Sequence, residues 1–154
     1  MVTVRLVYKP SQNREFNQLN PFFRTESGPM KKVMVVDDDP ETRLIVSDLL
    51  SRLDIKHEVA ASAGECLGRL VKDPNSYGLV LMDIHMPTLS GVDASTWISS
   101  SETDPPRSIP VVAFTGDKTY HCRNYVSQFG MKDFLAKPVT LDTLSDTVAS
   151  YAAL

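Results

Sequence analysis

Five short runs typical of strands alternate with five amphipathic stretches between residue 33 and the C-terminus. The strand-like runs cover residues 33–36, 56–60, 79–82, 109–114 and 132–135. The first of them is entirely apolar and mostly β-branched, which is typical of a strand covered on both faces. Strands that alternate with helices along a chain form parallel sheets. The sequence therefore predicts an α/β fold, a five-stranded parallel sheet with helices on both faces.

The amphipathic stretches predict helices. The first opens at Pro40, a favourable first helical position, and its Ile45, Leu49 and Leu53 recur every four residues with Val46 and Leu50 beside them. We predict that these apolar residues form its buried face, and that Leu44, which lies off the Ile45–Leu49–Leu53 stripe, is exposed. The remaining helices are predicted over residues 63–72, 92–100, 119–129 and 140–151.

Residues 1–30 lack this alternation of strands and helices. Val2, Val4, Leu6 and Tyr8 have the spacing of a short strand, and the rest of the segment is mostly polar. Three interpretations stay open: an artificial sequence or a mis-assigned start, a disordered linker, or an added strand used for association. A natural start fits directly before the first strand, so the predicted domain covers residues 31–154.

Charge and composition limit the partners of this domain. Residues 1–32 carry six basic and two acidic side chains, whereas residues 33–154 carry ten basic and seventeen acidic, a net charge of −7. Such a domain is repelled by nucleic-acid phosphates, so we expect no nucleic-acid partner. No apolar run is long enough to span a membrane. The two cysteines match no metal-ligand spacing and are too few for a disulfide framework, which favours a reducing, cytoplasmic location.

Polar residues follow four of the five predicted strands. In chain order they are Asp37, Asp38 and Asp39 after the first strand, Asp83 after the third, Thr115 after the fourth and Lys137 after the fifth. Each alone is typical of a turn, a helix cap or a solvated side chain. Together they favour a site, because ligands of open α/β sheets bind beyond the carboxyl ends of the strands.

The chemistry of this set is that of phosphoryl transfer. Clustered carboxylates repel one another unless a cation neutralises them, and oxygen ligands suit Mg²⁺. An aspartate can itself accept a phosphoryl group as an acyl phosphate. A lysine can pair with the transferred group as a point charge, and a threonine hydroxyl can donate to another of its oxygens. The strand ends therefore predict a magnesium-dependent phosphoryl site.

Five segments resemble the signature of response-regulator receiver domains of two-component phosphorelay systems. They are Val35-Val36-Asp37-Asp38-Asp39-Pro40, Leu81-Met82-Asp83-Ile84-His85-Met86-Pro87, Gly91, Ala113-Phe114-Thr115-Gly116 and Phe134-Leu135-Ala136-Lys137-Pro138. The resemblance covers about residues 31–153, and its second segment is similar to receivers attached to hybrid sensor kinases. It implies a flavodoxin-like fold with the strand order 2-1-3-4-5.

The resemblance also implies a role for each acidic residue. Asp83 would be the phosphoacceptor. Asp37, Asp38 and Asp83 would bind magnesium together with the backbone carbonyl of His85. Asp39 lies one place beyond the family's acidic pair, and we interpret it as a turn or cap residue.

The resemblance implies that the remaining signature residues bind the phosphoryl group or respond to it. Lys137 and Thr115 would each bind one of its oxygens, and Lys137 would pair with Asp83 before phosphorylation. Phe134 stands at the family's aromatic switch position, where tyrosine is common, and has no hydroxyl to hydrogen-bond outward. Thr115 and Phe134 would together form the switch. The Lys137–Pro138 bond is often cis in this family.

The resemblance implies that the chain is a signalling module rather than an enzyme, a phosphoacceptor that would be able to dephosphorylate itself. The donor would be a histidine kinase or a histidine phosphotransfer domain, and the phosphorylated form would bind a downstream protein target. No output domain fits after the last predicted helix, so we expect output through protein contact, onward transfer or a covalent neighbour. The alternative is a magnesium-dependent aspartyl-phosphate hydrolase. That class needs a carboxylate two residues after the nucleophile, where this chain has His85.

Overall fold

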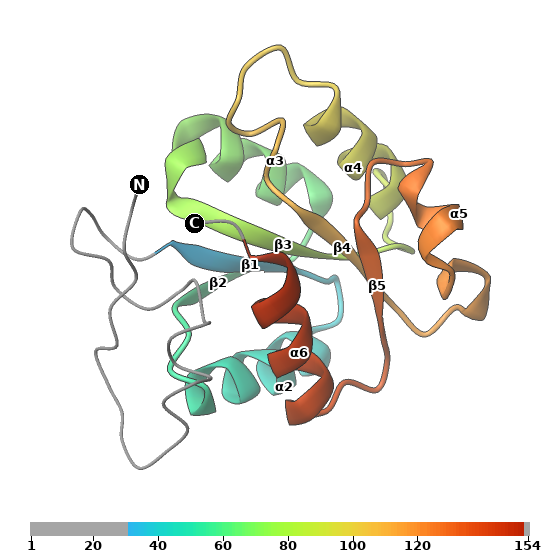
Figure 1. Cartoon of the computed structure of the whole chain (residues 1–154). Helices are drawn as coiled ribbons and strands as arrows, with labels where there is room; N and C mark the ends of the chain where they lie inside the picture. The colour runs from blue at the N-terminus through green and yellow to red at the C-terminus, as the bar shows by residue number, and fades with distance from the viewer. Residues whose placement is uncertain (1–30, 153–154) are drawn as a thin grey trace.

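The structure, a computed structural model, describes residues 31–152, so the three interpretations of residues 1–30 lie outside the described residues. Its centre is a five-stranded parallel sheet in the order β2-β1-β3-β4-β5, which confirms the predicted sheet and strand order (Figure 1). The strands are β1 (Lys32–Val36), β2 (His57–Ala60), β3 (Tyr77–Asp83), β4 (Val111–Thr115) and β5 (Asp133–Ala136).

Residues 31–152 also form five α-helices and two 3-10 turns, all between successive strands except α6, which follows β5. They are α2 (Pro40–Arg52), α3 (Ala63–Lys72), η1 (Pro74–Ser76), α4 (Gly91–Ser99), η2 (Lys118–Tyr120), α5 (Arg123–Ser127) and α6 (Leu141–Tyr151). No helix among residues 31–152 combines the length and apolar character that crossing a membrane would require.

Successive residues of a strand face opposite sides of the sheet, and this divides the core into two clusters. Val33 and Val35 of β1 pack in the cluster that contains the buried residues of α2 and α6. Met34 and Val36 of the same strand pack in the cluster that contains those of α3, α4 and α5. The helices therefore form two layers, with α2 and α6 on one face and the other three on the opposite face (Figure 1).

The buried face of α2 agrees with the prediction except at Ile45. Ile45, which was expected to be buried, is 50% exposed, whereas Val46 and Leu50 are fully buried. Leu49 and Leu53 are partly buried and pack against the same cluster, because packing against β1 and β3 centres the buried face on Val46 and Leu50. Leu44 is 72% exposed, as predicted.

The helix predicted over residues 119–129 is broken into η2 and α5. The carboxylate of Asp117 accepts a hydrogen bond from the backbone N–H of Thr119 and caps η2, while the extended backbone of Cys122 separates η2 from α5. The turn after α5 closes at Gly130, whose φ of +84° lies in the left-handed region that favours glycine. The other boundaries lie within two residues of the predicted ones.

Gly91 joins the start of α4 directly to the end of β3. Its N–H donates to the carbonyl of Ile84 at 2.9 Å. A Cβ at this position would lie 1.9 Å from the backbone carbonyl oxygen of Asp83, far inside contact distance. Only glycine therefore allows α4 to begin so close to the strand end that carries Asp83.

We expect the Gly91→Ala variant to lose about 3 kcal/mol or more of its free energy of unfolding, because the new methyl group meets backbone rather than a movable side chain. Urea unfolding followed by circular dichroism measures the loss. Gly68→Ala is the control, because Gly68 lies in α3 with nothing within 4 Å of the added Cβ. It should gain up to about 1 kcal/mol from helix propensity. Equal stability of the Gly91→Ala variant and wild type would contradict this view of the junction.

Candidate functional site

The polar strand-end residues meet at one edge of the sheet. Asp37 directly follows β1, Asp83 and Thr115 are the last residues of β3 and β4, and Lys137 directly follows β5. These four strands are consecutive neighbours in the sheet and all run in the same direction. Asp37, Asp83 and Thr115 are buried although they are polar. The sequence correctly predicted that these residues come together.

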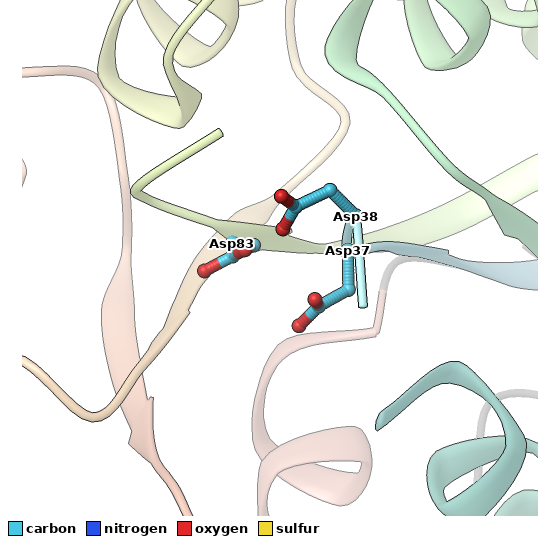
Figure 2. Close-up of side chains that lie close together, drawn as sticks. All are labelled: Asp37, Asp38 and Asp83. Atoms are coloured by element: carbon cyan, nitrogen blue, oxygen red, sulfur yellow. The ribbon is translucent and has the colours of Figure 1, made fainter. Parts of the chain in front are cut away.

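Three carboxylates form an acidic cluster at this edge. One oxygen each from Asp37, Asp38 and Asp83 lies within 4.8 Å of the other two, as Figure 2 shows for side chains from the ends of β1 and β3. Asp37 and Asp83 are buried, whereas Asp38 is exposed. Groups this close repel one another when they are all ionised. The cluster therefore needs positive charge from elsewhere.

Lys137 supplies part of that charge. Its Nζ lies 2.6 Å from Oδ2 of Asp37 and 3.4 Å from Oδ1 of Asp83, so it contacts both buried carboxylates and lies closer to Asp37. The ammonium also lies 4.8 Å from the ring centroid of Phe114, a distance typical of a cation–π contact. Burial opposes its charge, but the hydrogen bond to Asp37 and the charge of Asp83 raise the pKa of Lys137 above its ordinary value. The Lys137–Pro138 bond is cis.

Lys137 compensates the charge of Asp83 only in part. Burial and the negative charge of Asp37 raise the pKa of Asp83 to about 6, and Lys137 offsets only part of this rise. One ammonium cannot balance three carboxylates. A divalent cation would fit this donor set, because it would add two positive charges among oxygen ligands.

The raised pKa of Asp83 predicts how stability depends on pH in the absence of metal. The folded-state pKa of about 6 lies above the ordinary value of 3.8, so the protonated form stabilises the fold. This contribution is complete below about pH 4 and is lost as the pH rises through about 6. In EDTA, wild type should therefore lose up to about 3 kcal/mol relative to Asp83→Asn between pH 4 and 8. Urea unfolding at each pH measures the difference, and parallel profiles for the two proteins would contradict the shift.

The first turn of α2 holds the acidic pair in place. Asp39 caps the helix by accepting hydrogen bonds from the N–H groups of Glu41 and Thr42, as predicted for a cap residue. Its own N–H donates to Oδ1 of Asp37 at 2.9 Å. Arg43 donates from Nη1 to the backbone carbonyl of Asp37 at 2.8 Å, a contact that was not predicted. No spacing rule indicates it, because it depends on how the helix folds back over the strand end.

His85 and Asp117 lie beside each other in the loops that follow β3 and β4. Nε2 of His85 lies 2.7 Å from Oδ2 of Asp117, which links the loop after β3 to the loop after β4. This hydrogen bond, together with that from the N–H of Thr119, lowers the pKa of Asp117. The N–H of Asp117 in turn donates to the hydroxyl oxygen of Thr115 at 3.0 Å. The Thr115 hydroxyl oxygen is thus hydrogen-bonded to the loop after β4.

A second histidine, His121, contacts Thr115 from the other side. Its Nε2 lies 2.8 Å from the backbone carbonyl oxygen of Thr115, and its ring stacks on that of Phe134. No sequence pattern indicates His121, since it lies within a predicted helix and belongs to no motif. Folding places it between the two residues expected to form the switch.

Comparison with known proteins identifies the family to which this arrangement belongs. Residues 33–149 match the family described as the response regulator receiver domain. The chain is 32% identical over 121 residues to the CAI-1 autoinducer sensor kinase/phosphatase CqsS of Vibrio cholerae serotype O1. That match covers 79% of this chain and 17% of the kinase, so the chain spans a small part of that relative.

Solved structures with the same fold include two receivers. The chemotaxis protein CheY4 of Vibrio cholerae matches with a TM-score of 0.69 and 24% identity, over 79% of this chain and 98% of that one. The receiver domain of the response regulator Ssk1 of Saccharomyces cerevisiae, crystallised with the histidine phosphotransfer protein Ypd1, matches with a TM-score of 0.68 and 23% identity. This second match covers 79% of this chain and 88% of that one.

Proposed function

Since the chain belongs to the response regulator receiver domain family, we propose that it accepts a phosphoryl group on Asp83 from a histidine kinase or a histidine phosphotransfer protein. The observation that carries this proposal is the position of Asp83. Its carboxylate lies at the end of the central strand β3, in contact with Lys137 and within the acidic cluster. Asp37 shares these neighbours, but its two oxygens already accept hydrogen bonds from Lys137 at 2.6 Å and from the N–H of Asp39 at 2.9 Å, whereas Lys137 lies 3.4 Å from Asp83.

The proposed reaction transfers the phosphoryl group between two side chains. A carboxylate oxygen of Asp83 attacks the phosphorus of a phosphohistidine, the P–O bond forms and the P–N bond breaks, and the imidazole leaves with the electron pair. Lys137 is already held beside Asp83 and can pair with the incoming negative charge. Thr115 can turn its hydroxyl from the Asp117 side to donate to a phosphoryl oxygen.

We further propose that the acidic cluster binds magnesium. Asp37, Asp38 and Asp83, with the backbone carbonyl of His85, would supply the oxygen ligands. When bound, magnesium would relieve the repulsion within the cluster and add positive charge beside the phosphoryl oxygens. The role of Asp37 and Asp38 is to hold this charge next to Asp83.

The direct test of the proposed function is phosphoryl uptake by the purified protein. Incubation with magnesium and a small acyl-phosphate donor should add one phosphoryl group, detected by intact mass. EDTA should abolish the uptake, because it removes the magnesium. Among the described residues, Lys137 is then the ammonium left in contact with the acidic cluster. Absence of uptake at saturating magnesium and donor would argue against the proposal.

Exposed apolar residues near the site suggest where a protein donor docks. Leu44 and Ile45 are both at least half exposed in the first two turns of α2, directly after the acidic pair. The Ssk1 receiver was crystallised with a histidine phosphotransfer protein, and we propose a donor of that class for this chain. An apolar surface at the rim suits the helical face of such a donor.

We expect the Leu44→Asp variant to accept a phosphoryl group from a protein donor at least about tenfold more slowly, because a charge would be buried in the docked complex. Its uptake from the small acyl phosphate should be unchanged, since Leu44 lies outside the acidic cluster. Rapid-quench kinetics with both donors separate the two effects. Val71→Asp is the matched control, because Val71 is 62% exposed on α3, whose buried residues pack on the opposite face of the sheet. Equal slowing with both donors would place the defect in the site itself.

The proposed output is a contact with a downstream protein rather than with nucleic acid. The described domain belongs to the acidic part of the chain, which disfavours binding to phosphate backbones. We propose a cytoplasmic location, because the donor class is an intracellular kinase or its phosphotransfer partner. In this role the chain is a phosphoacceptor that can lose its phosphoryl group to water, not an enzyme acting on a separate substrate.

A further inference from the structure

Thr115 is hydrogen-bonded to both ends of the loop between β4 and α5. Near the start of the loop, the N–H of Asp117 donates to the hydroxyl oxygen of Thr115 at 3.0 Å. Near its end, Nε2 of His121 lies 2.8 Å from the backbone carbonyl oxygen of Thr115. A carbonyl only accepts, so Nε2 of His121 carries the proton. The same carbonyl accepts the N–H of Lys137 at 3.1 Å, which ties it to the end of β5.

The imidazole of His121 has a second contact, on its flat face. It stacks on the ring of Phe134 with a centroid distance of 5.0 Å and an angle of 15° between the planes. Phe134 is half-buried on β5 and packs against the cluster beneath α3, α4 and α5. Its ring has no polar atom, so packing contacts such as this one set its position. One side chain therefore touches both Thr115 and Phe134.

We infer that His121 is the positioning residue that couples Thr115 to Phe134. The inference rests on the proposed function, in which a phosphoryl group on Asp83 attracts the Thr115 hydroxyl. That movement releases the N–H of Asp117 and frees the start of the loop. The end of the loop stays attached to Thr115 through His121, so the displacement reaches the imidazole and changes the space open to the Phe134 ring.

The two contacts of His121 can be removed separately. The His121→Phe variant keeps an aromatic ring against Phe134 and loses the hydrogen bond to the Thr115 carbonyl. His121→Gln keeps a donor and loses the stacking, and His121→Ala loses both. His57→Ala is the matched control, because His57 contacts Ser47 and the carbonyl of Ile55 near β2, at the opposite edge of the sheet.

Each variant is first phosphorylated with magnesium and acyl phosphate, and uptake is measured by intact mass. Chemical shifts of the Phe134 ring and of the backbone amides of η2, α5 and β5 are then recorded before and after phosphorylation. All the His121 variants should take up one phosphoryl group, as wild type and His57→Ala do. Their phosphorylation-induced shifts at Phe134 should fall by about twofold or more, because coupling needs both contacts. Thr115→Ala should show the same loss.

The possible failures are distinguishable. If wild type takes up no phosphoryl group, the proposed function is wrong. If wild type is phosphorylated and His121→Ala is not, His121 acts in the acceptor chemistry and the coupling role is overturned. Undiminished shifts at Phe134 in phosphorylated His121→Phe or His121→Gln would also overturn it, and these two variants decide the question if His121→Ala fails to fold.

Discussion

The Asp83→Asn variant is expected to take up no phosphoryl group at any magnesium or donor concentration. An amide has almost the same volume as a carboxylate, so the fold is preserved, but it lacks the anionic oxygen that attacks phosphorus. The nearest buried carboxylate, Asp37, is already hydrogen-bonded to Lys137 and to the N–H of Asp39, so we expect no neighbouring carboxylate to take the place of Asp83. Intact mass after incubation with acyl phosphate is the measurement.

Asp39→Asn is the matched control for this result. Asp39 belongs to the same aspartate run but is exposed and caps α2 through hydrogen bonds that asparagine can replace. This variant should take up one phosphoryl group, as wild type does. Full labelling of Asp83→Asn would show that a different residue is the acceptor.

The Asp38→Ala variant is expected to lose magnesium-dependent phosphorylation. Asp38 is the exposed member of the acidic cluster, whereas Asp37 and Asp83 both contact Lys137. Removing it takes away a ligand and also part of the repulsion that a cation relieves. We expect magnesium affinity to fall by at least about tenfold, and uptake to fail at magnesium concentrations that saturate wild type.

Magnesium titrations of the initial uptake rate measure this effect. Glu41→Ala is a suitable control, because Glu41 is exposed in the first turn of α2, outside the acidic cluster, and its loss removes the same charge. Uptake by Asp38→Ala that does not depend on metal would refute the proposed magnesium site. A more stable metal-free fold in this variant is a further expected result, because like charges then repel less.

The sequence was sufficient to place the acidic cluster because the fold class itself brings strand ends together. Asp37, Asp83 and Lys137 are far apart in the chain, yet parallel neighbouring strands bring their carboxyl ends to one edge. The residue types then indicated the chemistry. The pattern did not show that Lys137 would lie closer to Asp37 than to Asp83, because that depends on rotamers and burial.

The contacts that support the site depend on tertiary structure and could not be predicted. Arg43 reaches the carbonyl of Asp37 only because α2 folds back over β1, and His121 reaches Thr115 only because its helix is broken. Periodicity identified α2 as a helix with Val46 and Leu50 on its apolar face, but packing left Ile45 half exposed. Local pattern therefore fixes which segments are helices, while contacts between segments decide their exact rotation and ends.

The division of the core into two clusters has a consequence for how binding partners share the surface of this molecule. The proposed donor surface lies on α2, whose buried residues belong to one cluster, whereas Phe134 and the buried residue of α5 pack in the other. A donor on α2 would therefore leave the side that contains Phe134 and α5 uncovered. The proposed function then predicts that a donor and a downstream protein can bind one receiver at the same time, without exchanging places on a shared surface.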